Sequence, residues 1–144
     1  MKTKIIAILS IMVVLFSTVL IVNAAEQREK SSLFMNGGET VTGKTRNYNY
    51  KKHKIEFYPV RLGFLEGEIS TYNKLYIRLE KKGLVFYSNK GETTIRGIEK
   101  LNQKYGYNFG NQGTGKFRYV FNTGSKYDWY GTIEADPVYM YSYE

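Results

Sequence analysis

The sequence contains no cysteine among its 144 residues. The chain can therefore form no disulfide, offers no thiolate to a metal and has no cysteine to carry a lipid anchor. An exported protein without disulfides is more typical of bacteria than of secretory routes built on disulfide frameworks. The folded part must be held together by packing and hydrogen bonds alone.

Histidine is nearly absent as well, which limits the chemistry available to the chain. The one histidine, His53, stands in the run Lys51-Lys52-His53-Lys54, where neighbouring positive charge disfavours both a metal ligand and a general base. A Ser-His-acid triad would have to use His53, and no serine lies in a nucleophile-elbow sequence. The sequence therefore predicts a protein that is not an enzyme, and it implies neither a cofactor nor a metal.

Carboxylates are the remaining candidates for catalysis. Glu66 and Glu68 lie two residues apart, and Asp128, Glu134 and Asp136 follow near the carboxyl end. Glycoside hydrolysis needs two carboxyl groups roughly 5 to 9.5 Å apart, and spacing along the chain does not establish that separation. Scattered acids on exposed strands are the more common finding, so a cell-wall glycan hydrolase is kept only as a further alternative.

Long apolar runs occur once, at the amino terminus. Two lysines precede an uncharged, mostly apolar stretch over residues 5–22, and Ala24 provides a small residue for cleavage. This pattern predicts a signal peptide over residues 1–24, with a retained membrane anchor as the alternative. Either way the functional part lies outside the cell. We expect residues 25–32 to form a flexible leader and residues 33–144 to form a single domain.

Positive charge exceeds negative charge over the chain as a whole. The full sequence carries a net charge of +8, and removal of residues 1–24 takes away two lysines and no acid, which leaves +6. Such an excess attracts polyanions over a long range. Outside a cell the candidate partners are an anionic wall polymer, an acidic polysaccharide or an anionic membrane surface, whereas nucleic acid is a less suitable partner. The oligomeric state is not encoded in the pattern.

Alternation of apolar and polar residues predicts an all-β fold. Leu75, Ile77 and Leu79 fall on one side of a strand, and a run of short strands with turn signals between them continues along the chain. We expect an antiparallel β-sandwich, or a small barrel, of about seven to eight strands. In particular, Leu84-Val85-Phe86-Tyr87 is expected to return from a turn at residues 81–83 and to end at a second turn over residues 88–91.

One segment is ambiguous. Ile95, Ile98 and Leu101 recur at helical spacing, while Gly97 weakens a helix. The segment over residues 94–104 is therefore either one short helix or a strand followed by a loop.

Aromatic residues are abundant, with 14 tyrosines, 8 phenylalanines and one tryptophan. Many lie in the last third of the chain, where a strand over residues 116–121, a turn and further strands are expected. Exposed tyrosines provide amphipathic surfaces on which sugar rings or a partner can dock, although cross-strand pairing alone also accounts for them. The candidate ligand-binding residues are the tyrosines and cations of this region: Tyr119, Tyr130, Tyr139, Tyr141, Tyr143, Lys116, Arg118 and Lys126.

These observations favour a secreted, non-catalytic β-sandwich that binds the cell envelope or an extracellular anionic or glycan polymer. The hypothesis requires that the tyrosines and cations face outward on a shared side. A membrane-active or antibacterial secreted protein is the principal alternative, because basic charge with exposed aromatic residues would serve that function too.

Overall fold

The computed structural model describes residues 25–63, 74–124 and 131–144, and within these ranges the chain folds into β-strands without a helix. The predicted all-β antiparallel sandwich is confirmed, with nine strands in the described ranges rather than the expected seven to eight. Residues 1–24, where a signal peptide is expected, lie outside the described part. The strands are β1 (Glu26–Asn36), β2 (Thr40–Thr42), β3 (Arg46–Tyr48), β4 (Lys52–Gly63), β5 (Lys74–Lys82), β6 (Tyr87–Arg96), β7 (Tyr105–Asn111), β8 (Gly115–Asn122) and β9 (Thr132–Tyr143).

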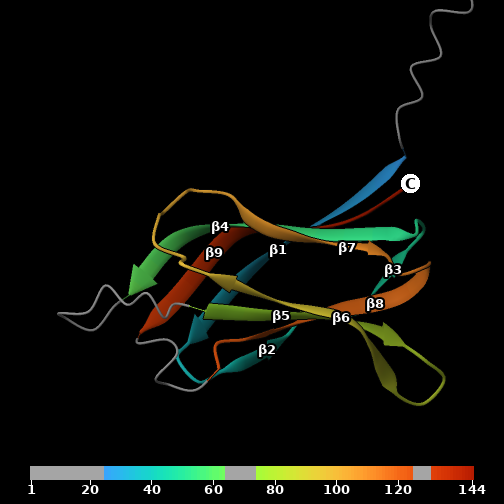
Figure 1. The fold of residues 1–144 in the computed structure, drawn as a ribbon, viewed down its shortest axis with the longest axis horizontal. Coiled ribbons are helices and arrows are strands. Elements are labelled where there is room, and N and C mark those ends of the chain that lie inside the picture. Colours follow the sequence, from blue (N-terminus) through green and yellow to red (C-terminus); the bar gives the residue numbers. More distant parts are fainter. Residues whose placement is uncertain (1–24, 64–73, 125–130) are drawn as a thin grey trace, which may run out of the picture.

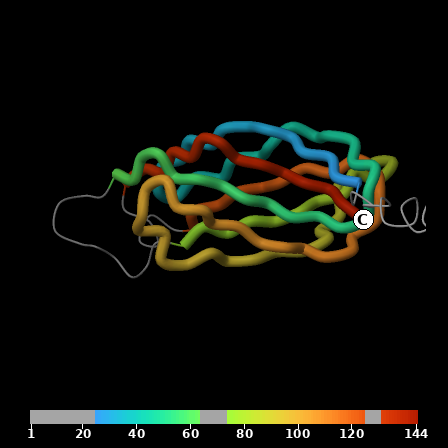
Figure 2. Tube along the Cα trace, turned by 90° about the horizontal axis from the view of Figure 1, so that it is seen from above, coloured from blue at the N-terminus to red at the C-terminus, as the bar shows by residue number. Residues whose placement is uncertain are grey.

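The strands form two antiparallel sheets that face each other (Figures 1 and 2). Sheet A has the order β1-β9-β4-β7, and sheet B has the order β2-β8-β5-β6, with β3 also paired to β8. The amino-terminal and carboxyl-terminal strands are direct neighbours, because Glu26 on β1 lies opposite Tyr143 on β9. No described segment forms a helix long and apolar enough to cross a membrane.

The core lies between the sheets and follows from the period of two along each strand. On β4, Ile55 and Phe57 are fully buried, while Glu56 between them and Tyr58 after them are partly exposed. The same alternation places Phe117, Tyr119 and Phe121 of β8 inside. Since the inner faces of both sheets contribute bulky apolar side chains, packing stabilises the fold without a disulfide.

Polar contacts join the two sheets at the edge where β1 approaches β3. Arg46 on β3 forms an ion pair and hydrogen bond with Glu29 on β1. Gln27 donates a hydrogen bond from Nε2 to the Asn47 carbonyl oxygen at 2.8 Å. Most of the residues expected to form a flexible leader belong to β1, because they pair with β9, and their side chains also contact the other sheet.

The β5–β6 hairpin differs from its prediction. Strand β6 covers Tyr87–Arg96 and includes all of the expected turn over residues 88–91, where a register shift opposite Leu79 and Glu80 accommodates one extra residue. Leu84, Val85 and Phe86, expected to lie in the returning strand, form the tip of the hairpin instead. The segment 94–104 is the end of β6 followed by a loop, so the helical alternative is wrong.

Candidate binding faces

The outer face of sheet A carries a row of tyrosines. Tyr139, Tyr141 and Tyr143 alternate along β9 with the buried residues Val138 and Met140. The rings of Tyr139 and Tyr141 lie 6.0 Å apart between centroids. The three tyrosines therefore project to one side of their strand.

Cations from the two neighbouring strands cover these rings. The Arg28 guanidinium carbon of β1 lies 4.9 Å from the centre of the Tyr139 ring. From β4, Lys54 Nζ lies 4.2 Å from the centre of the Tyr141 ring, and Lys52 Nζ lies 5.8 Å from that of Tyr143. Each cation is attracted to the electron-rich face of a ring, so the tyrosines are already engaged by the protein's own side chains.

Tyr141 is the most buried of the three tyrosines. Its hydroxyl donates to Glu56 Oε2 at 3.0 Å, and its side chain is almost covered. Burial, together with the adjacent Glu56 carboxylate, raises the pKa of Tyr141 to about 12. The hydroxyl therefore stays protonated and donates its hydrogen bond over the whole physiological range.

The charges on this tyrosine face nearly cancel. Lys54 forms ion pairs with Glu26 at 3.7 Å and with Glu56 at 3.9 Å, and Lys30 lies 4.0 Å from Asp136. Because positive and negative charges on this face nearly balance, the face attracts a polyanion only weakly. The outward charged residues of β1, β4 and β9 are Arg28, Lys30, Lys52, Lys54 and Arg61 against Glu26, Glu56, Glu134 and Asp136.

The outer face of sheet B is more basic. Lys116 and Arg118 project from β8 between the buried Phe117 and Tyr119, and Arg118 lies opposite Glu80 of β5. Six basic residues face outward from β5, β6 and β8, whereas two carboxylates do so within these strands. The basic residues are Lys74, Arg78, Lys82, Arg96, Lys116 and Arg118, and the acidic ones are Glu80 and Glu92.

Glu80 organises the centre of this basic face. Its two carboxylate oxygens accept hydrogen bonds at 2.8 Å from Arg78 Nε and from Arg118 Nε. The Arg118 guanidinium carbon also lies 3.5 Å from the centre of the Tyr87 ring on β6. One carboxylate thus orients two guanidinium groups, and the three groups together carry a net charge of +1. The remaining N–H groups of both arginines can donate to phosphate or carboxylate oxygens of a ligand.

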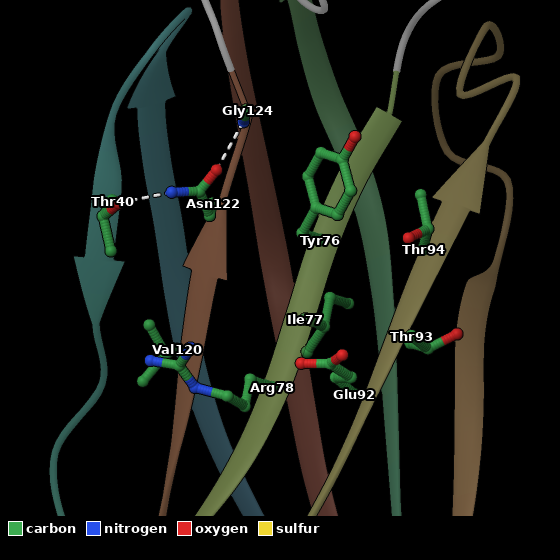
Figure 3. Close-up of a pocket in the computed structure, with 10 residues that line it drawn as sticks. All are labelled: Thr40, Tyr76, Ile77, Arg78, Glu92, Thr93, Thr94, Val120, Asn122 and Gly124. Atoms are coloured by element: carbon green, nitrogen blue, oxygen red, sulfur yellow. Dashed lines mark hydrogen bonds between the residues drawn. The ribbon is translucent and has the colours of Figure 1, made fainter. Parts of the chain in front are cut away.

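A shallow groove of about 700 Å³ runs along the basic face (Figure 3). Tyr76 and Arg78 rise from β5 in its middle, with Asn122 of β8 on one side and Thr94 of β6 on the other. Asn122 donates to Thr40 Oγ1 on β2 and accepts from the Gly124 N–H group. The groove offers an aromatic ring, hydroxyls and a guanidinium to an extended ligand. Its lining also includes Ile77, Glu92, Thr93 and Val120.

The structure does not bring the predicted site residues together. Tyr119 is buried, with 1% of its surface exposed, and its hydroxyl donates to the Lys54 carbonyl oxygen. It cannot contact a surface ligand, because alternation turns it inward with Phe117. Lys116 and Arg118 lie on the outer face of sheet B, opposite the tyrosine face of sheet A, so the expectation of a shared side is wrong for them. Tyr130 and Lys126 lie outside the described residues.

Sequence reasoning missed Tyr76, Arg78 and Arg96 as site residues. The alternation of β5 already indicated that Tyr76 and Arg78 face outward from Leu75 and Ile77. Only the pairing of β5 with β8, which are far apart in sequence, shows that these side chains adjoin Arg118.

The carboxylates considered for catalysis are not brought together within the described residues. Glu66, Glu68 and Asp128 lie outside them, and Glu134 and Asp136 are on the tyrosine face. Within the described ranges no group of three or more histidine or carboxylate side chains gathers as metal ligands would.

His53 is fully buried rather than exposed among lysines. Its Nε2 lies 2.8 Å from the Gly113 carbonyl oxygen. Burial lowers the pKa of His53, with Lys81 acting in the same direction and the Gly113 carbonyl oxygen opposing both.

Comparison with known proteins supplies no relative in sequence. No family matches the chain, and no curated protein does. Among solved structures, a chain of infectious bursal disease virus Gt strain aligns with a TM-score of 0.46 at 8% identity, covering 81% of this chain and 31% of the viral one. A disulfide-linked pilus from Bacillus endospore appendages aligns at 0.41 and 7%, covering 84% and 90%. PliG of Aeromonas hydrophila, a periplasmic inhibitor of g-type lysozyme, aligns at 0.41 and 11%, covering 87% and 91%. At these TM-scores the matches carry no argument about function.

Proposed function

We propose that this protein is a secreted, non-catalytic binding protein whose basic face, the outer face of sheet B, takes an extracellular anionic polymer. The observation that carries the proposal is the excess of six basic over two acidic side chains on that face. Of these charged residues, Arg78 and Glu92 line the groove itself. An anionic wall polymer and an acidic polysaccharide share the required chemistry, because both repeat phosphate or carboxylate groups along a hydroxylated backbone.

The side chains suit such a ligand in two ways. Arg78 and Arg118 are fixed in orientation by Glu80, so less freedom is lost when their remaining N–H groups bind an anion. Tyr76 and the hydroxyls of Thr40 and Thr94 line the groove, where a polyol or sugar unit can pack and hydrogen-bond between charged groups. The groove is open and shallow, as an extended polymer requires.

The test is a binding titration with three defined polymers. Poly(glycerol phosphate) and alginate present phosphate and carboxylate groups, and neutral dextran provides the uncharged comparison. We expect binding of at least one of the two polyanions, weakened about tenfold or more when NaCl is raised from about 50 to about 300 mM, and no binding of dextran. Salt-insensitive binding, or binding of dextran alone, would contradict the proposal.

Two variants of equal charge locate the binding face. The triple variant Arg78→Gln, Arg96→Gln, Lys116→Gln removes three charges from the basic face, and the control Lys30→Gln, Lys52→Gln, Lys104→Gln removes three charges elsewhere. We expect the first to weaken polyanion binding about tenfold or more and the control to change it much less. An equal loss in both would mean that net charge alone attracts the polymer.

A further inference from the structure

The tip of the β5–β6 hairpin exposes three consecutive apolar side chains. Leu84, Val85 and Phe86 have exposed fractions of 105%, 79% and 80%. The loop is closed by a hydrogen bond from the Gly83 N–H group to the Phe86 carbonyl oxygen at 2.8 Å. The hairpin bends away from the two sheets as it approaches this tip (Figure 1), so its three apolar residues, the hairpin tip, are presented clear of the sandwich.

The fold itself does not require these residues to be apolar. The core closes without them, and a hairpin turn is ordinarily made of polar residues or glycine. Other large apolar side chains on the described surface are single and partly covered, with Phe34 at 53% and Leu101 at 51% exposed. Scattered residues of that kind are normal, whereas a continuous exposed apolar group marks a contact.

The surroundings of the hairpin tip are cationic. Residues 82–91 contain Lys82 and Lys90 and no acidic residue, whereas Lys81 turns inward, with its Nζ 5.4 Å from the centre of the Phe117 ring. The nearest acid in the strand, Glu80, is already bound by Arg78 and Arg118. Lys81 lies opposite Phe117, so the exposed Lys116 stands beside the base of the hairpin. The apolar side chains of the hairpin tip therefore have positively charged side chains near them.

This combination suits a lipid bilayer better than a protein partner. A stable protein interface takes about 800 Å² from each partner with matched shape, and three side chains on a narrow loop offer less. A bilayer accepts a small apolar protrusion at the boundary between headgroups and acyl chains, while lysines remain at the headgroups. Anionic headgroups complement the lysines, each of which adds attraction at the surface.

We propose that Leu84, Val85 and Phe86 insert into the interface of an anionic membrane and dock the protein there. This contact is separate from polymer binding at the groove and does not depend on it. In the docked orientation the sandwich stands on its hairpin end, with the lysines around the tip against the headgroups.

The absence of cysteine allows a direct test of insertion. A single cysteine introduced as Leu84→Cys and labelled with the environment-sensitive dye NBD reports transfer of that position out of water, and Phe34→Cys provides a matched exposed control. With vesicles of phosphatidylcholine containing about one third phosphatidylglycerol, we expect a blue shift and a several-fold rise in emission at position 84 and no change at position 34. Vesicles of phosphatidylcholine alone should produce neither.

Vesicle sedimentation of the unlabelled protein tests the same contact without a dye. The double variant Leu84→Ser, Phe86→Ser should reduce the fraction bound to the anionic vesicles about tenfold, whereas the matched variant Phe34→Ser, Leu101→Ser should bind like the wild type. Equal binding by the tip variant, an equal dye response at both positions, or an equal response on uncharged vesicles would overturn the proposal. A dye shift that grows with protein concentration without vesicles would overturn it in favour of contact with a second copy.

Discussion

At the scale of single residues, His53 shows how far a side chain's environment can differ from that of its sequence neighbours. Lys52 and Lys54 point to the outer face of sheet A, while His53 between them points into the core. There its ring lies 4.4 Å from that of Phe117 and 5.3 Å from that of Tyr48, between centroids. Its Nδ1 atom is buried and has no hydrogen-bond partner among the described residues, so a neutral ring with the proton on Nε2 fits the site.

The buried His53 should make the fold sensitive to mild acid. Because burial lowers its pKa in the folded protein, the unfolded chain takes up a proton near pH 6.5 that the folded chain resists. The free energy of unfolding should therefore fall as the pH drops through that value, by at most about 1.4 kcal/mol per pH unit from this group.

Denaturant unfolding at a series of pH values, on the wild type and on His53→Gln, checks this prediction. Glutamine keeps an N–H group for the Gly113 carbonyl oxygen but does not titrate, so the variant's stability should vary less between pH 7 and 5. Since carboxylates titrate in both proteins, the difference between the two profiles isolates His53. Parallel profiles would contradict the prediction.

At the scale of elements, strand β5 was predictable and its partner β6 was not. Leu75, Ile77 and Leu79 alternate with polar residues, and all three are buried. Strand β6 is largely polar, because it is an edge strand held by its pairing with β5, so its pattern gave no apolar alternation to detect. The apolar run Leu84-Val85-Phe86 is typical of a strand in sequence, but it forms the tip of the hairpin.

The helical spacing of residues 95–101 has a similarly local explanation. Ile95 packs against the core from the end of β6, and Ile98 is buried just beyond a bend at Gly97, where a φ of +66° favours glycine. Leu101 is exposed. The i, i+3 spacing therefore arises from a bend in the chain, and single-sequence periodicity could not distinguish it from a helix.

Glu80 on β5 links its strand to β8 through Arg118. Its side chain is only 10% exposed, and it binds Arg78 and Arg118 together. Glu80→Gln leaves two neighbouring guanidinium groups without their anion, so we expect a loss of about 1 to 3 kcal/mol in the free energy of unfolding. The matched variant Glu92→Gln makes the same charge change at an exposed position and should shift stability by no more than about 0.5 kcal/mol. Similar losses in both, measured by chemical denaturation, would exclude a special role for Glu80.

At the scale of the whole molecule, the sandwich class followed from alternation and turn signals, but the assignment of strands to sheets did not. The hypothesis from sequence requires the tyrosines and cations of the last third of the chain to share one side. The strand over residues 116–121 is β8, whereas Tyr139, Tyr141 and Tyr143 lie on β9, which belongs to the other sheet. Pairing between distant strands depends on the whole core, so the sequence could identify outward residues on each strand without showing which of them share a face.

The edge contact between β1 and β3 should couple the two sheets energetically. The Glu29 and Arg46 side chains are 34% and 23% exposed, so their ion pair is partly shielded from water. A double-mutant cycle with Glu29→Gln and Arg46→Gln should give a coupling of about 0.5 to 1 kcal/mol in the free energy of unfolding. The pair Lys30 and Asp136, at 4.0 Å and more than half exposed, should give a coupling close to zero. Equal coupling energies would show that the Glu29–Arg46 ion pair stabilises the fold no more than the exposed pair does.

The pairing of β1 with β9 has a practical consequence for how the protein is handled. The Glu144 N–H group donates to the Ala25 carbonyl oxygen at 3.3 Å, and this corner lies at the same end of the sandwich as residues 83–86 (Figure 1). Capture on a bead or sensor chip through a carboxyl-terminal tag would therefore press the projecting loop toward the support and shield it. A tether placed near Asn36, at the far end of β1, would leave that loop free to meet its target.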